Sequence, residues 1–97
     1  MPRVTLKLYT MFRAAAGTEQ LELELPPGSK VHDALEHASQ QLGQAFRELI
    51  WDTRSGRVLP FLISVNARVE PSLGGVLENT VEDGDIIAVL DPVGGGH

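Results

Sequence analysis

Two stretches near the N-terminus alternate between apolar and polar side chains. In residues 4–9 every second side chain is a valine or leucine, and residues 20–25 repeat the pattern with leucines separated by glutamates. A period of two is typical of a strand that buries one face. The two stretches therefore predict a hairpin, and residues 10–17 are expected to form the connection between its strands.

A helical period follows the second predicted strand. Residues 26–28, Pro-Pro-Gly, end that strand, and Ser29 is expected to cap a helix because its hydroxyl can accept hydrogen bonds from free N–H groups of the first turn. The helix is predicted over residues 30–42, followed by a short helical segment at residues 45–50. The buried stripe of the main helix is expected to comprise Val31, Ala34, Leu35, Ala38 and Leu42.

The second half of the chain predicts three more strands, at residues 58–65, 68–70 and 86–90. The last of these is densely apolar, as expected for a strand at the centre of a sheet, and it follows an irregular crossing and a turn at residues 83–85. A right-handed crossover would place it beside the first strand. The predicted fold class is α+β, a β-grasp arrangement in which one principal helix covers a mixed sheet of four to five strands.

Composition narrows the possible functions. A chain of 97 residues is expected to form one domain, and the absence of cysteine excludes disulfides, thiolate metal sites and cysteine nucleophiles. The net charge of −5 disfavours binding to nucleic acid and to anionic membranes. No apolar run approaches the roughly 20 residues that span a bilayer, and the N-terminus alternates instead of resembling a signal peptide, so a cytoplasmic protein is expected.

The C-terminal residues suggest where the chemistry lies. Residues 1–92 are expected to form the folded domain, and residues 93–97 a flexible glycine-rich tail. Pro92 restricts the backbone where the chain leaves the last strand, whereas Gly94, Gly95 and Gly96 have no Cβ and can enter a channel too narrow for other residues. The tail is therefore predicted to insert into a partner protein.

Five motifs are spread over the whole chain. They are VTLKLYTMFRAAAG at residues 4–17, PPGSKVHDALE at 26–36, SVNARV at 64–69, VEDGD at 81–85 and DPVGGG at 91–96. In this order they resemble the MoaD and ThiS family of sulfur carriers, which are ubiquitin-like β-grasp proteins. The chain is most similar to the MoaD-type and CysO-type carriers of that family.

The resemblance implies that the protein is a carrier and not an enzyme. An E1-like activating enzyme holding ATP and Mg²⁺ would convert the carboxylate of Gly96 into an acyl-adenylate. A sulfur donor would then displace AMP and leave a thiocarboxylate. The chain itself would bind no cofactor. The sulfur acceptor would be a cysteine synthase or the large subunit of molybdopterin synthase, in which case this chain would be the small subunit.

His97 departs from the family pattern, because the reacting carboxylate belongs to a terminal glycine and here another residue follows Gly96. Two explanations remain open. A peptidase removes His97 before activation, as JAMM-type zinc metallopeptidases do for some carriers of this family, or His97 was appended to the natural chain.

The family's hydrophobic contact positions correspond to Tyr9, Val69 and Leu90, with Arg13 as a nearby polar contact. The resemblance implies that these residues bind the partner enzyme together with Pro92 and Val93 of the tail. The alternative for Val69 and Leu90 is a place in the hydrophobic core. For Tyr9 exposure is favoured, because its neighbours in the strand take the inward face.

Other functions remain possible. An activated Gly96 could instead form isopeptide bonds with lysines, as small archaeal modifiers do, and a plain β-grasp interaction module with an inert tail is a third reading. No metal site is predicted, because His32 and His37 are five residues apart and would not share one face of a helix.

Overall fold

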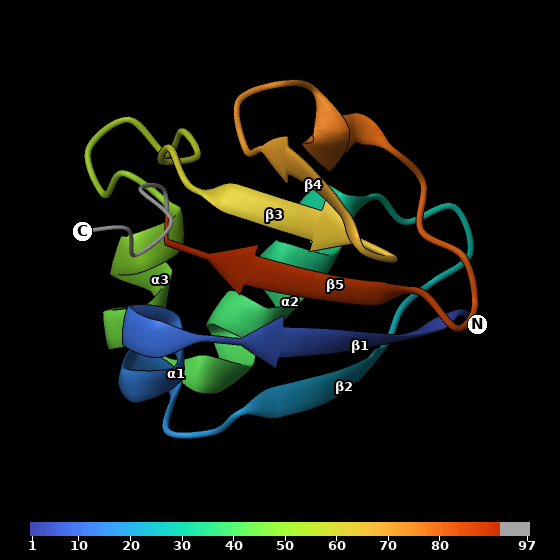
Figure 1. Ribbon diagram of the computed structural model, residues 1–97, viewed down its shortest axis with the longest axis horizontal. Coiled ribbons are helices and arrows are strands. Elements are labelled where there is room, and N and C mark those ends of the chain that lie inside the picture. The colour runs from blue at the N-terminus through green and yellow to red at the C-terminus, as the bar shows by residue number, and fades with distance from the viewer. Residues whose placement is uncertain (92–97) are drawn as a thin grey trace.

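The computed structural model describes residues 1–91, and they form a five-stranded mixed sheet with helices on one face (Figure 1). The strand order is β2-β1-β5-β3-β4. The elements in chain order are β1 (Arg3–Leu8), α1 (Thr10–Ala16), β2 (Gln20–Glu24), α2 (Val31–Leu42), α3 (Gln44–Ile50), β3 (Leu62–Val65), β4 (Arg68–Pro71), the 3₁₀ turn η1 (Val76–Glu78) and β5 (Ile86–Leu90). The predicted α+β β-grasp class is confirmed.

The predicted hairpin of the first two strands and the predicted central place of the last strand are also confirmed. β1 pairs with β2 in antiparallel fashion, with Arg3 opposite Glu24. β5 lies at the centre, parallel to β1 on one side and antiparallel to β3 on the other. Its residues Ile87 and Val89 are fully buried against the helices, which explains why the sequence of this strand is so densely apolar.

Helix α2 crosses behind the sheet and supplies most of the helical side of the core (Figure 1). Four residues of its predicted stripe are buried, and Leu42 at its last turn packs against the core while partly exposed. The first turn differs from the expectation. Ser29 does not cap the helix, because its hydroxyl donates to the Pro26 carbonyl at 2.7 Å. Lys30 is the N-cap residue, and its backbone N–H donates to the Asp33 carboxylate at 2.8 Å.

The connection predicted at residues 10–17 is in fact the short helix α1, ended by Gly17. Only Phe12 of this helix is fully buried, and its ring packs edge-on against Phe61, with ring centroids 5.7 Å apart. One buried large side chain in two turns produces no repeating apolar stripe. The sequence predicted a connection between the strands but not that the connection is helical, because Phe12 is its one fully buried residue and no periodic apolar face marks it.

The strand predicted at residues 58–65 is shorter than expected. β3 begins at Leu62, and Val58 makes only an isolated bridge to Trp51. Pro60 accounts for the late start, because a proline has no N–H to donate to a neighbouring strand. Within the crossing that follows β4, η1 buries Val76 and Leu77.

Two of the five motifs meet at one end of the sheet. The turn between β3 and β4 consists of Asn66 and Ala67, both with positive φ, at 52° and 73°. The amide of Asn66 donates to the Asp85 carboxylate at 2.9 Å, and the Asn66 side-chain oxygen accepts the Ile86 N–H at 2.9 Å. Because Ile86 begins β5 and Asp85 directly precedes it, these bonds tie the β3–β4 hairpin to the central strand.

Among residues 1–91, no helix has both the length and the apolar character needed to cross a membrane. The described chain ends at Asp91, directly after β5. The predicted boundary between domain and tail lies outside the described residues.

Candidate functional site

The face of the sheet turned away from the helices carries a row of apolar side chains. In the register of the sheet, Leu62 of β3 lies opposite both Leu90 of β5 and Pro71 of β4. Tyr9 follows Leu8, which pairs with Val89, and its backbone is still extended. Tyr9 and Leu90 are therefore neighbours on the open face, and the row runs from Tyr9 through Leu90 and Leu62 to Pro71.

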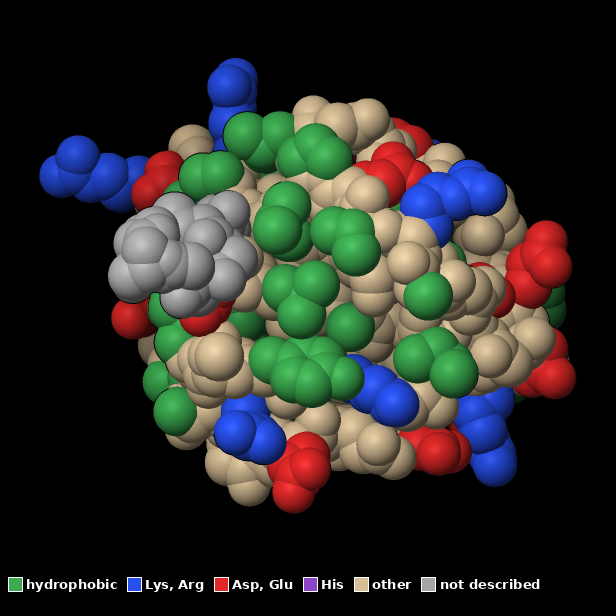
Figure 2. Space-filling model, viewed as in Figure 1, with side chains coloured by type: hydrophobic (Ala, Val, Ile, Leu, Met, Phe, Trp, Pro, Cys, Tyr) green, Lys and Arg blue, Asp and Glu red, His purple; other side chains and the backbone are tan. Residues whose placement is uncertain are grey.

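A second row lies one step along the strands. It contains Lys7, Ala88 and Ser64, which are paired across β1, β5 and β3, and it ends at Val69 of β4. We call these two rows together the docking surface. Figure 2 shows hydrophobic side chains gathered over the middle of this face.

The structure places the predicted contact residues on this face and not in the core. Tyr9 is 41% exposed, Val69 is 54% exposed and Leu90 is half-buried. The side chains that face the helices from the same strands, such as Val89 and Ile63, are fully buried. The alternative of a core position for Val69 or Leu90 is excluded for the described chain, while a role in binding a partner stays a prediction.

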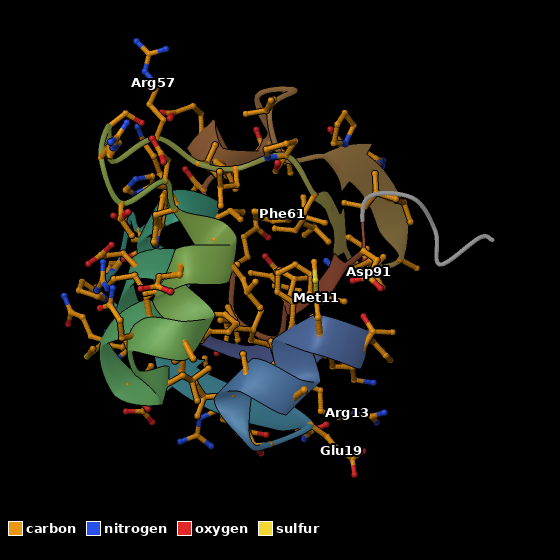
Figure 3. The ribbon with its side chains drawn as sticks, turned by 90° about the vertical axis from the view of Figure 1, so that its left-hand side faces the viewer. Met11, Arg13, Glu19, Arg57, Phe61 and Asp91 are labelled. Atoms are coloured by element: carbon orange, nitrogen blue, oxygen red, sulfur yellow. The ribbon has the colours of Figure 1, made fainter. Side chains whose placement is uncertain are left out.

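Two cationic side chains lie in the docking surface or on the same side of the molecule. Arg13, in the last turn of α1, is exposed, and Figure 3 shows it on the same side of the molecule as Asp91. Within residues 1–91 the ion pairs are Arg3–Glu24, Lys30–Glu78 and Arg47–Glu36.

Lys7 and Arg13 make none of these contacts, so both can meet a carboxylate of a bound partner.

The Arg3–Glu24 contact lowers the pKa of that glutamate, first through the hydrogen bond and then through the opposite charge.

The end of β5 connects this surface to the C-terminus. Leu90 and Asp91 are the last described residues, and Leu90 lies in the first apolar row beside Tyr9. The predicted tail residues Pro92, Val93, Gly94, Gly95 and Gly96, and also His97, lie outside the described residues. The segment that leaves β5 therefore begins at the docking surface.

No cluster of three His, Asp or Glu side chains that could hold a metal ion occurs within residues 1–91. His32 is the exposed partner in a ring contact with Trp51, with centroids 5.0 Å apart. This histidine therefore has a packing partner in the fold.

A model of the ThiS family matches residues 6–96, which is nearly the whole chain and includes the glycine tail. The chain belongs to the ThiS family. It is therefore a ubiquitin-like sulfur carrier, and members of this family are small carrier proteins that work with partner enzymes. No curated protein matches the sequence.

Solved structures agree with membership of the ThiS family. The small archaeal modifier protein 1 of Methanosarcina acetivorans is 29% identical, with a TM-score of 0.80 over 99% of this chain and 98% of that one. A protein of Pyrococcus furiosus described as a candidate molybdopterin converting factor, subunit 1, is 27% identical, with a TM-score of 0.73 over 95% of this chain and 99% of that one.

CysO of Mycobacterium tuberculosis is 20% identical, with a TM-score of 0.64 over 91% of this chain and 97% of that one. At this identity the likeness shows a shared fold.

Sequence reasoning did not assign five members of the docking surface, namely Lys7, Leu62, Ser64, Pro71 and Ala88. Lys7 was detectable, because it occupies a polar position of the alternating first strand. Leu62 and Pro71 were not, because their place depends on the late start of β3 and on the register of its hairpin with β4.

Proposed function

We propose that this chain is a sulfur carrier of the cytoplasm that is activated at Gly96 by an E1-like enzyme. The observation that carries the proposal is the position of the docking surface. Its apolar rows flank the end of the central strand from which the tail departs. A partner that covers Tyr9 and Leu90 is thereby placed where it can receive the next residues of the chain.

The length of the tail limits where the partner's active site can lie. Five residues, Pro92 to Gly96, separate Asp91 from the reacting carboxylate. A fully extended segment of that length spans at most about 18 Å. The activating enzyme must therefore bind ATP within this distance of the docking surface, at the end of a channel that glycine can enter.

The proposed reaction has two steps. The Gly96 carboxylate attacks the α-phosphate of ATP, and pyrophosphate leaves as the acyl-adenylate forms. Hydrosulfide from a sulfur donor then attacks the carbonyl carbon, AMP departs, and loss of the S–H proton leaves the thiocarboxylate. The partner enzyme binds ATP and Mg²⁺, and this chain supplies the reacting carboxylate. Catalysis therefore rests on positioning and charge stabilisation by the activating enzyme.

Activation is tested by ATP–pyrophosphate exchange with chains that end at Gly96 or at His97. The shorter chain should be adenylated. The longer one should be inert, because the carboxyl group of Gly96 is then in an amide bond to His97. In the shorter chain Gly95→Val should stop the exchange without unfolding the domain. Exchange by the untrimmed His97 form would refute the need for processing, and exchange by Gly95→Val would refute the narrow channel.

Docking is tested by measuring affinity for the activating enzyme. Tyr9→Ala should weaken binding by more than about 1 kcal/mol, because an aromatic side chain at the centre of an interface is often a hot spot. Leu73→Ala is the matched control, since Leu73 is an exposed apolar residue outside the docking surface. Equal affinities for a folded Tyr9→Ala variant and the control would remove Tyr9 from the interface.

The thiocarboxylate is proposed to donate sulfur in molybdopterin or cysteine biosynthesis. The first acceptor is the large subunit of molybdopterin synthase, with this chain as the small subunit, and the second is a cysteine synthase. A JAMM-type metallopeptidase is the proposed partner for removing His97. Intact-mass measurement tests the carrier role, because replacement of one oxygen by sulfur adds a defined mass that should disappear when the correct acceptor is supplied.

Protein modification is the second candidate function, and the 29% identity to a small archaeal modifier protein favours it. In this role activated Gly96 would form isopeptide bonds with lysines. Lys7 and Lys30 are the only lysines of the chain itself; Lys7 lies in the docking surface and Lys30 pairs with Glu78 at 3.0 Å. Conjugates of the Gly96 form on lysines would support this role, and a thiocarboxylate without conjugates would support the carrier.

A further inference from the structure

A concave surface lies outside the docking surface and shares no residue with it. It is a trough of about 570 Å³ between the loop that follows α3, the start of α2 and the segment that follows β4. Its apolar wall consists of Trp51, Val58, Leu73 and Leu77. A smaller hollow of about 350 Å³ shares His32, Trp51 and Gly56 with it. We call the larger hollow the Trp51 trough.

The wall of the Trp51 trough is held in place by the fold. The Trp51 indole N–H donates to the Ser39 hydroxyl at 3.1 Å, and the His32 ring packs on the indole. On the other side, the Ser72 hydroxyl donates to the Leu59 carbonyl at 2.6 Å and accepts the Phe61 N–H at 3.0 Å. The trough therefore exists before any ligand binds, which reduces the ordering cost of binding.

One apolar side chain at the rim is unusually exposed. Leu73 is 64% exposed, although the next apolar residues along the chain, Val76 and Leu77, are buried. Its contribution to the domain's own core is therefore small. A partner that packed against Leu73 would remove the exposed apolar area of this side chain from water, with the buried Trp51 as the floor of the contact.

The charge at the trough opposes that of the whole protein. Residues 52–57 form a loop closed by Asp52, whose carboxylate accepts the Ser55 N–H at 3.1 Å and the Ser55 hydroxyl at 2.7 Å. This loop presents Arg54 and Arg57, and neither belongs to an ion pair within residues 1–91.

Asp52 is the one carboxylate of residues 52–57, so the loop with its two arginines keeps a formal charge of +1. Glu78, the carboxylate on the opposite rim, is already paired with Lys30. A chain of net charge −5 thus keeps an uncompensated positive charge beside an apolar trough.

We propose that the Trp51 trough binds an extended acidic segment of a partner protein. One bulky apolar side chain of that segment lies between Trp51, Val58 and Leu73, and a neighbouring carboxylate pairs with Arg57. Charge complementarity favours an acidic ligand over a basic one. Figure 3 shows Arg57 on the opposite side of the molecule from Arg13 and Asp91. The inference does not depend on the proposed function.

The test is a titration of isotope-labelled protein followed by NMR. The probe is a short synthetic peptide with one leucine flanked by aspartates. Saturable shifts are expected at the Trp51 indole N–H and at the amides of Gly56 and Leu73, without shifts at Tyr9. A peptide with lysines in place of the aspartates, and one with alanine in place of the leucine, should each bind at least about 5-fold more weakly.

Variants of the protein test the two proposed contacts from the side of the trough. Leu73→Ser and Arg57→Glu should each weaken binding at least about 5-fold, and both replace exposed side chains, so the fold is expected to persist. Arg68→Glu is the matched control, because this exposed arginine begins β4 and does not line the trough.

Absence of saturable shifts at Trp51, or equal binding of the lysine peptide, would overturn the proposal. It would also be overturned if these shifts appeared on raising the protein concentration without peptide, since the trough would then bind a second copy of the chain.

Discussion

The two residues of the β3–β4 turn should respond in opposite directions to the same substitution. Ala67 has a φ of 73°, a conformation that costs a residue with a Cβ about 1 to 2 kcal/mol. Glycine removes that cost but adds about 0.4 to 1 kcal/mol of unfolded-state entropy. Ala67→Gly is therefore expected to stabilise the domain by about 0.8 kcal/mol, the difference between the middle values of these two ranges.

Asn66→Gly should instead be destabilising. Asparagine tolerates a positive φ, so glycine relieves little strain at this position. The substitution removes the bond from the Asn66 amide to Asp85 and the bond from the Ile86 N–H to the Asn66 oxygen. At about 0.5 to 1.5 kcal/mol for each hydrogen bond, the expected loss is about 1 to 3 kcal/mol.

Urea unfolding of both variants measures these changes. The midpoint of Ala67→Gly should rise and that of Asn66→Gly should fall, with the dependence on urea unchanged. A lower midpoint for Ala67→Gly would show that the positive φ is not strained. An unchanged midpoint for Asn66→Gly would show that the two side-chain hydrogen bonds do not hold the hairpin to β5.

Three further substitutions test the core and one surface loop. Phe12→Ala should cost about 3 to 5 kcal/mol, whereas Met11→Ala, which replaces an exposed residue of the same helix, should change stability by less than about 0.5 kcal/mol; equal losses in urea unfolding would contradict the anchoring of α1 by Phe12. Leu35→Ala should cost about 2 to 5 kcal/mol by leaving a cavity under the sheet, and a change below about 0.5 kcal/mol would place Leu35 outside the core. The Ser55 hydroxyl, followed by the Ser55 N–H, lowers the pKa of Asp52, so this carboxylate stabilises the fold above its ordinary pKa and loses that effect as the pH falls through the folded value. Ser55→Ala should raise the pKa of Asp52 toward its ordinary value, as measured by NMR titration of the carboxyl group, and an unchanged pKa would show that the hydroxyl does not bind Asp52.

Elements with a repeating pattern could be predicted from the sequence. The alternation of β1 and β2, the apolar stripe of α2 and the density of β5 each repeat over several residues, so a single irregular position does not obscure them. The fold class followed from the order of these elements. The placement of Tyr9 on the open face followed from the same alternation, because Leu6 and Leu8 take the inward positions.

Features that depend on one residue or on distant contacts could not be predicted. Phe12 is the one fully buried residue of helix α1, and its partner Phe61 lies about half the chain away in the sequence. The exposure of Val69 and Leu90 depends on strand register, which hydrogen bonds between β3, β4 and β5 determine. The Trp51 trough is formed by the start of α2 and two irregular segments, and their sequence patterns give no sign that they lie together.

The register of β5 links the stability of the domain to the position of the tail. Along this strand Ile87 and Val89 enter the core, while Ala88 and Leu90 face the docking surface. A shift by one residue would exchange the two sets and also move the start of the tail relative to Tyr9. The hydrogen bonds between the Asn66 side chain and residues Asp85 and Ile86 hold the N-terminal end of β5, where such a shift would have to begin. The motifs SVNARV and VEDGD therefore act at a distance from the proposed chemistry, because they determine where along the sheet the C-terminal segment leaves the domain.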